Sequence, residues 1–140
     1  MSPYSIERSS DPEVRRLLGE QIDVHNLEAT GIREWHPLTF VVRDGDGELA
    51  AGADGWEWGG TCFVKSLWVR EDRRRSGLGT ALMKAMEADA RRLGCTQMVL
   101  ETHSFQAPAF YEQLGFAHAG GVTGYPRGEA FLLMVKPLGD

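Results

Sequence analysis

The chain has 140 residues, of which 42% are hydrophobic and 25% charged, so we expect one compact domain over residues 1–140 rather than a disordered chain. Its net charge of −5, from 15 basic and 20 acidic residues, argues against nucleic acid as a partner. No apolar run approaches the roughly 20 residues that span a membrane, and the N-terminus lacks the apolar core of a secretory signal. The two cysteines, Cys62 and Cys95, have neither a metal-ligand spacing nor a disulfide framework, so a cytoplasmic setting without a bound metal is expected.

The first third of the chain predicts a strand and then a helix. Residues 4–8 have the composition of a short first strand. Asp11, Pro12 and Glu13 then supply an N-cap, a proline for the first helical position and an acidic first turn. We expect the helix to run toward residue 27, with Gly19 as its weak point.

Three strands linked by tight turns are predicted next, over residues 38–43, 48–58 and 61–69. The sequence Asp-Gly-Asp-Gly at residues 44–47 is typical of a hairpin turn, and glycines inside 48–58 indicate β-bulges. Strands joined by such short turns are antiparallel neighbours.

The second half of the chain alternates helices and strands. A long helix is predicted over 77–93, a strand over 97–102, a short helix over 107–114, and strands over 116–119 and 130–136. The two strands that flank the long helix need a crossover and are therefore parallel. The fold class is α/β: a single-domain mixed, mostly antiparallel sheet of about six to seven strands with helices on both faces.

The segment 67–80 combines a strand, a basic turn and a glycine-containing helix start. Unpartnered N–H groups and the helix dipole at such a terminus bind anions such as a pyrophosphate, and Gly77 and Gly79 allow phosphate oxygens to approach the backbone. The P-loop pattern is absent, and the dinucleotide fingerprint lacks its third glycine because Leu82 stands there.

Two blocks of the chain resemble the GCN5-related N-acetyltransferase (GNAT) family. Residues 74–79 (Arg-Arg-Ser-Gly-Leu-Gly) fit that family's Arg/Gln-x-x-Gly-x-Gly/Ala loop. Residues 104–116 match its pattern Asn-x-x-Ala-x-x-x-Tyr-x-x-x-Gly-Phe at Ala107, Tyr111, Gly115 and Phe116. The resemblance implies an acyl-CoA N-acyltransferase fold. It also implies transfer of an acetyl group from acetyl-CoA, as co-substrate, to a primary amine of a small molecule or peptide by direct attack in a ternary complex. It leaves a homodimer open, because related enzymes are often dimers.

The resemblance also assigns roles to individual residues. It implies that Arg74 opens the coenzyme A loop, and that the pyrophosphate is held by the backbone amides of Arg75, Ser76, Gly77, Leu78, Gly79 and Thr80. The strand Leu67-Trp68-Val69 is expected to pair with the pantetheine arm through its backbone, and the Val69 amide to polarise the thioester carbonyl. One or two of the three arginines at 73–75 are expected to be solvated.

Tyr111 is implied as the general acid that protonates the departing thiolate, rather than a tyrosine that is only packed on its helix. Ser104 stands where the family often has asparagine, so its shorter side chain or that of Gln106 is expected to contact the cofactor, next to Ala107.

The general base is not fixed by the sequence. Glu101 and Glu57 are the candidates, although a solvated or ion-paired carboxylate is the commoner state of either, His103 lies next to the site in sequence, and a water chain is a further alternative. Buried packing is expected for both cysteines. Trp35, Trp56 and Trp58 line either the acceptor pocket or the core. The alternative function is a catalytically silent acyl-CoA sensor, against which the intact loop and Tyr111 argue.

Overall fold

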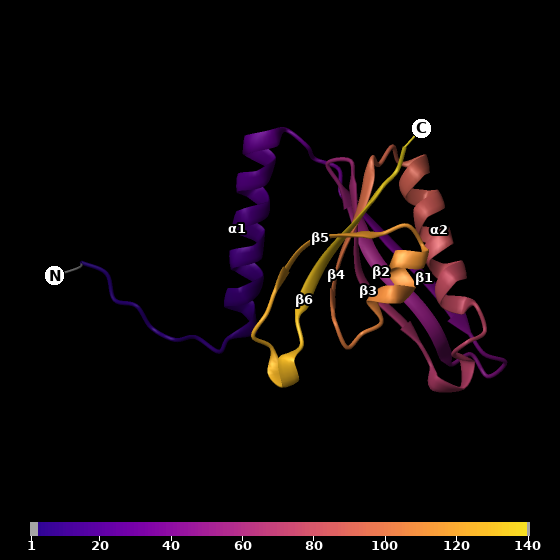
Figure 1. Cartoon of the computed structure of the whole chain (residues 1–140). Coiled ribbons are helices and arrows are strands. Elements are labelled where there is room, and N and C mark those ends of the chain that lie inside the picture. The colour runs from indigo at the N-terminus through magenta and orange to yellow at the C-terminus, as the bar shows by residue number, and fades with distance from the viewer. Residues whose placement is uncertain (1–2, 140) are drawn as a thin grey trace. The chain divides into compact units, whose positions relative to one another are not determined.

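The computed structural model describes residues 3–139, which divide into two compact units between Glu34 and Trp35 (Figure 1). The prediction of a single domain over 1–140 therefore stays a prediction, and each unit is described by itself. Within the described residues, no helix combines the length and the apolar character needed to cross a bilayer.

The N-terminal unit contains helix α1, Pro12–Thr30. The predicted cap is confirmed, because the Asp11 carboxylate accepts a hydrogen bond from the Glu13 N–H at 2.9 Å. Gly31, at a φ of 73°, ends the helix, which runs through Gly19 without a break. The predicted strand over 4–8 is wrong, since no strand forms there. Two alternating apolar residues offer too little burial to offset the ordering of the segment as a strand.

The second unit is built on a six-stranded sheet with the order β1-β2-β3-β4-β6-β5. Its strands are β1 (His36–Arg43), β2 (Leu49–Trp58), β3 (Thr61–Val69), β4 (Gln97–His103), β5 (Ala117–Val122) and β6 (Phe131–Pro137). Only the central pair β3–β4 is parallel, and every other neighbouring pair is antiparallel. The predicted mixed, mostly antiparallel sheet is confirmed, with six strands.

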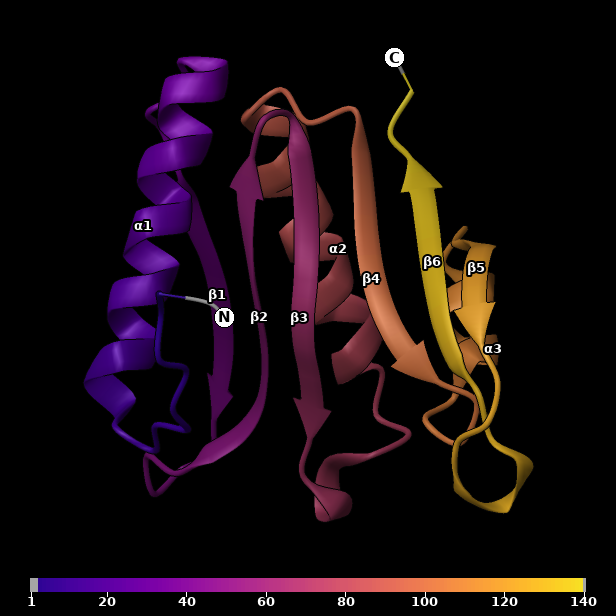
Figure 2. The ribbon, with the colours of Figure 1, turned by 90° about the vertical axis from the view of Figure 1, so that its left-hand side faces the viewer.

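Two helices of this unit lie on the same face of the sheet, as Figure 2 shows. They are α2 (Leu78–Arg92) and α3 (Pro108–Gln113), and two 3-10 turns, Glu71–Arg73 and Pro126–Gly128, complete the unit. The apolar side of α2 packs against residues that β1–β4 and β6 turn toward it. The buried residues of this core are Leu38, Ala51, Ala53, Cys62, Val64, Leu82, Met83, Met86, Ala90, Cys95, Met98, Leu100, Phe116, Met134 and Leu138.

A β-bulge and a split interrupt the sheet at nearly the same level. Asp54 pairs with Ser66 but Gly55 pairs with Val64, so Lys65 of β3 is the extra residue, as the glycines of β2 predicted. Gly55 is required there, because a Cβ would lie 2.2 Å from the carbonyl oxygen of Phe63. Beyond Val64 and Leu100, β3 and β4 no longer pair, and β4 curves away (Figure 2). We call this divergence the split.

Candidate active site

Backbone groups of β3 face the split. The Arg70 N–H donates to the Ala50 carbonyl of β2 at 2.8 Å. Because successive residues of a strand direct their backbone groups to opposite edges, Val69 and Leu67 direct theirs toward β4. The two strands do not pair at this level, so the Val69 N–H and the backbone groups of Leu67 are available to an extended ligand.

The turn between β3 and α2 presents a row of amides. Arg75 and Gly77 have φ values of 64° and 84°, a left-handed geometry that recurs where backbone N–H groups form anion-binding concavities. Ala81 is the first residue of α2 whose N–H finds a helical partner, the Gly77 carbonyl at 3.0 Å. Among the described residues, nothing accepts a hydrogen bond from the N–H groups of residues 75–80, and no side chain caps α2. The segment therefore has the chemistry of a pyrophosphate site.

The arginines of this segment differ in their contacts. Arg74 folds back so that its Nε donates to the Val69 carbonyl at 3.0 Å. Arg73 lies 3.9 Å from the Asp72 carboxylate. Arg75 is exposed, and its side chain forms no ion pair within residues 3–139, so it fits the expected solvated arginine.

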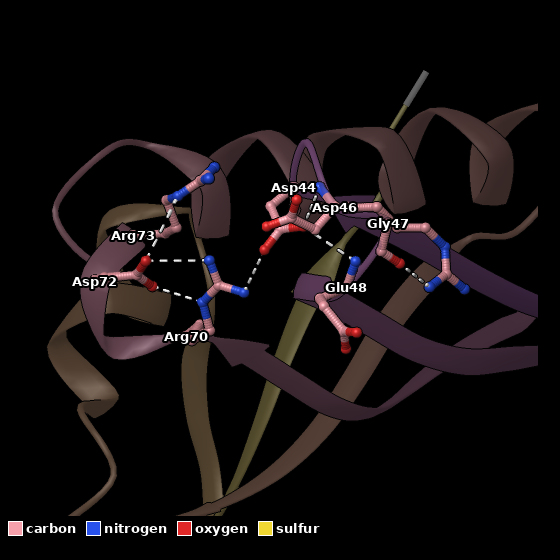
Figure 3. A network of polar contacts seen from close by, with 8 residues as sticks. Asp44, Asp46, Gly47, Glu48, Arg70, Asp72 and Arg73 are labelled. Carbon is pink, nitrogen blue, oxygen red and sulfur yellow. Dashed lines mark hydrogen bonds and ion pairs between the residues drawn. The ribbon is translucent and has the colours of Figure 1, made fainter.

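A network of charged residues ties the start of the turn between β3 and α2 to the β1–β2 turn (Figure 3). Arg70 donates to both oxygens of Asp72, at 2.6 and 3.0 Å, and to Asp44 Oδ2 at 2.9 Å. The other oxygen of Asp44 accepts from the N–H groups of Asp46 and Glu48 in the β1–β2 turn. The Arg70 guanidinium, and then the two amides, hold the pKa of the Asp44 carboxyl below its usual range.

The two sequence blocks meet at the start of α2. A Cβ on Gly79 would lie 3.3 Å from Phe110 Cζ of α3 and 3.9 Å from Leu67 Cδ2 of β3. Tyr111, the next residue of α3, packs between Phe110 and Phe116, with ring centroids 5.1 and 6.0 Å away. Burial raises the pKa of the Tyr111 phenol, so the hydroxyl keeps its proton at neutral pH.

The loop after β4 holds its polar side chains within the chain. The Ser104 hydroxyl donates to Glu129 and accepts from the Ala130 N–H at 2.8 Å. Gln106 Oε1 accepts from the backbone N–H of His103 at 2.9 Å and lies 2.9 Å from His103 Nδ1. Both side chains assigned to the cofactor by resemblance are thus engaged, and Ala107, at a φ of 71°, turns the chain into α3.

The two carboxylates considered as the general base lie at different ends of the sheet. Glu101 is exposed near the end of β4, where the split is open. Glu57 is 8% exposed and lies 2.8 Å from His36 Nδ1. Its cross-strand neighbour is Cys62, at the start of β3, so Glu57 lies at the closed end of the split. The geometry thus favours Glu101 over Glu57.

The aromatic residues of β2 and both cysteines are packed. Trp56 stacks with Trp35 and Phe63, at centroid distances of 6.4 and 4.8 Å. Both cysteines are free and buried, and burial raises the pKa of the Cys62 thiol to about 12 and also raises that of Cys95. A thiol held protonated in this way is a poor nucleophile.

Two relationships in this region were not predicted from the sequence: the Arg70–Asp44 ion pair and the His103–Gln106 contact. The first joins residues 26 positions apart, and no local pattern signals such a pairing. The second lies inside the second sequence block, where the spacing of a histidine and a glutamine three residues later was the only available signal.

A mixed sheet that splits between two parallel strands, beside an anion-binding helix terminus, defines a protein that binds an extended, phosphate-bearing ligand. The Acetyltransferase (GNAT) family model matches residues 4–116, and the chain belongs to this family. Blasticidin-S acetyltransferase of Streptomyces morookaense is 42% identical over 120 residues, which cover 80% of this chain and 85% of that protein. The crystal structure of an acetyltransferase from Bacillus cereus has a TM-score of 0.82 at 27% identity and covers 96% of this chain and 98% of its own. A Bacillus anthracis protein crystallised with acetyl coenzyme A has the same fold, with a TM-score of 0.65 at 17% identity over 76% of this chain and 65% of its own.

Proposed function

We propose that this acetyltransferase moves an acetyl group from acetyl-CoA to a primary amine of a small molecule, by direct attack in a ternary complex. The observation that carries the proposal is the split: unpaired backbone of β3 lies directly before a helix terminus whose six amides have no partner. An extended pantetheine arm that ends in a pyrophosphate matches both features. The binding of acetyl-CoA by this fold supports the assignment.

The residues of the chain divide the binding of the cofactor between main chain and side chains. The amides of residues 75–80 hold the pyrophosphate. The backbone groups of Leu67 pair with the pantetheine amides, and the Val69 N–H, beyond Trp68 in the strand, faces the thioester end of the arm. Ser104, Gln106 and Ala107 border the arm from the β4 side. Arg74, close to the Val69 carbonyl, adds positive charge at the entrance of the split.

Acetyl-CoA supplies the activated acyl group as a thioester. The Val69 N–H is aimed at the oxyanion that develops on the carbonyl oxygen during attack, and a single donor of this kind contributes about 10²–10³ in rate. Tyr111 holds a proton on its buried phenol and delivers it to the sulfur as the thiolate leaves. The raised pKa of the phenol suits a donor that must stay protonated until the carbon–sulfur bond breaks.

The acceptor is proposed from the named relative. Because the chain is 42% identical to a blasticidin-S acetyltransferase, an amine-bearing antibiotic of this kind is the first acceptor to test. The negative net charge suits a cationic substrate. A peptide amine and a homodimer stay predictions.

The test combines acetyl-CoA with blasticidin S and a panel of other amines: amino acids, polyamines and a short peptide. Release of free thiol is followed, and the acetylated product is identified by mass spectrometry. We expect transfer to at least one small-molecule amine, and about a 10²-fold loss of kcat in Tyr111→Phe with an unchanged KM for acetyl-CoA. Binding of acetyl-CoA without transfer to any amine would contradict the proposal and favour a silent sensor.

A further inference from the structure

The His103 side chain at the end of β4 is held in one tautomer. Its backbone N–H donates to Gln106 Oε1 at 2.9 Å, and its ring Nδ1 lies 2.9 Å from the same oxygen. A backbone N–H is only a donor, so it fixes which end of the Gln106 amide faces His103. The facing atom is a carbonyl oxygen, which only accepts, so Nδ1 must carry the hydrogen.

The other ring nitrogen, Nε2, therefore carries the lone pair in the neutral imidazole. Within residues 3–139 no group forms a hydrogen bond with Nε2. A histidine with one nitrogen bound as donor and the other left open is arranged to accept a proton. This is the division of roles by which an orienting partner prepares an imidazole for general-base chemistry.

Aromatic rings fix the plane of the imidazole. Phe105 stacks on it at a centroid distance of 5.2 Å and an interplanar angle of 17°. Tyr125 and Phe131 meet it edge-on, at 5.0 and 5.9 Å. The ring thus has supports from the loop after β4, from the β5–β6 connection and from β6, and Gln106 sets its rotation.

His103 points to the face of the sheet opposite α2. Leu100 belongs to the core beneath α2, and successive strand residues point to opposite faces, so Glu101 and His103 point to the other face. The amides of residues 75–80 and Tyr111 are on the α2 side. A cofactor that enters from that side leaves the opposite face to the amine.

We infer that His103 is the general base that deprotonates the acceptor amine, and that Gln106 is the positioning residue that keeps its Nε2 unprotonated. The inference rests on the proposed acetyl transfer. It replaces Glu101, which shares this face of β4, as the proton acceptor. Of the other titratable residues, Tyr125 packs edge-on against the imidazole and Glu129 accepts from the neighbouring Ser104. Within residues 3–139 neither forms a hydrogen bond with Nε2.

The chemical step balances without a further reactant. The ammonium of the acceptor gives one proton to His103 Nε2, and the resulting amine attacks the thioester carbonyl carbon. A carbon–nitrogen bond forms, and the carbon–sulfur bond then breaks with its electron pair on sulfur. Sulfur takes the Tyr111 proton, and the second amine proton passes to solvent, which also restores the phenol and the neutral imidazole. The products are the amide, coenzyme A and one proton.

The first test replaces His103 by asparagine. The Asn side chain keeps a donor near the position of Nδ1 but has no counterpart of Nε2. We expect kcat to fall about 10²- to 10³-fold, with the KM for acetyl-CoA unchanged and part of the rate restored by added imidazole. Glu101→Gln, on the same face of the strand, tests the rival base, and we expect it to lower kcat by much less than His103→Asn does.

The second test changes Gln106, and its first readout needs no turnover. The ring ¹⁵N chemical shifts of His103 should report the Nδ1–H tautomer in the wild type. In Gln106→Met they should report a larger population of the Nε2–H tautomer. Gln106→Met should lower kcat about tenfold, the equivalent of one hydrogen bond to an important group. Gln106→Glu keeps an acceptor opposite Nδ1, so it should restore the tautomer and move the acidic limb of the rate profile to higher pH, since the carboxylate stabilises the imidazolium.

The outcomes separate the base from the overall function. If His103→Asn transfers acetyl at the wild-type rate, or if Glu101→Gln carries the loss instead, His103 is not the base although the acetyltransferase activity stands. An Nε2–H tautomer in the wild type would overturn the role of Gln106. If the wild type acetylates no amine of the panel, the proposed function falls, and the base with it.

Discussion

Arg70 and Asp44 form an ion pair, at 2.9 Å between Nη1 and Oδ2, that ties the β1–β2 turn to the segment before α2 (Figure 3). Arg70 directly follows Val69, the last residue of β3, and precedes the row of amides by five positions. The pair therefore fixes the point where the chain leaves the sheet, and with it the position of the amides relative to the split.

Loss of this pair should weaken binding of the cofactor more than it slows chemistry. We expect Arg70→Ala to raise the KM for acetyl-CoA several-fold while kcat changes less than twofold, because the amides lose their fixed position and Tyr111 does not. Steady-state kinetics measure both constants. Arg92→Ala, which removes the ion pair of Arg92 with Asp89 on α2, is the control and should change neither.

The Asp44 carboxyl makes a contribution to stability that depends on pH. Its pKa is lowered in the folded state, so its contribution is present above the pKa of an unfolded aspartate, about 4, and is lost as pH falls through the folded value. The free energy of unfolding of Asp44→Asn should therefore be lower than that of the wild type at pH 7, and the two should converge at strongly acidic pH. Urea unfolding of both proteins over this pH range tests the prediction. A difference in the free energy of unfolding that stays constant with pH would contradict it.

Gly77 supplies a left-handed residue to the coenzyme A turn, and Gly94 supplies one at the end of α2. Neither site has any atom within 4 Å of an added Cβ, so alanine at either costs only backbone strain, about 1–2 kcal/mol. We expect the two variants to lose similar stability in thermal unfolding. Only Gly77→Ala should raise the KM for acetyl-CoA. Equal KM values for the two variants would mean that the turn does not bind the cofactor.

Gly55 should tolerate no side chain, because its Cβ would overlap the Phe63 carbonyl. Gly55→Ala is expected to destabilise the protein by about 1–3 kcal/mol or more and to reduce kcat, since the bulge at Lys65 must shift. Gly120→Ala is the control, with its nearest neighbour, Leu133 Cδ2, at 4.0 Å. Urea unfolding should distinguish the two variants, and equal stabilities would mean that the bulge relaxes freely.

The Tyr111 phenol should titrate above the ordinary tyrosine value of about 10, because burial disfavours the phenolate. Because the folded state holds this proton more tightly than the unfolded state does, the free energy of unfolding falls as pH rises from the unfolded pKa through the folded pKa. Ultraviolet difference titration of the wild type against Tyr111→Phe isolates this one phenol of three. A midpoint at or below 10 would contradict the burial.

Much of the fold was predicted from local signals. The Asp11 cap, the turn at residues 44–47 and the parallel crossover around α2 each rest on residues close in sequence, and all three are present. The strand predicted over 4–8 failed because strand formation depends on distant partners, which a short alternation cannot indicate.

The candidate site was predicted only where backbone chemistry has a sequence signature. Glycines at 77 and 79 mark the amide row, whereas side-chain partners leave no such mark. The contact of Gln106 with His103 was not predicted, and the expected contact of Gln106 with the cofactor stays a prediction. Glu57 was considered as a base although β2 carries it to the closed end of the split. The register of the strands decides these distances, and composition does not encode it.

The sheet is continuous across its middle through four residue pairs only, Thr61–Val64 with Gln97–Leu100. One three-stranded half lies on each side of this seam, β1–β3 on one and β4–β6 on the other. Within each half, neighbouring strands pair along their length. Beyond this seam the two halves are joined through α2, whose core residues pack against strands of both, so the width of the opening depends on that helix as well as on the four pairs.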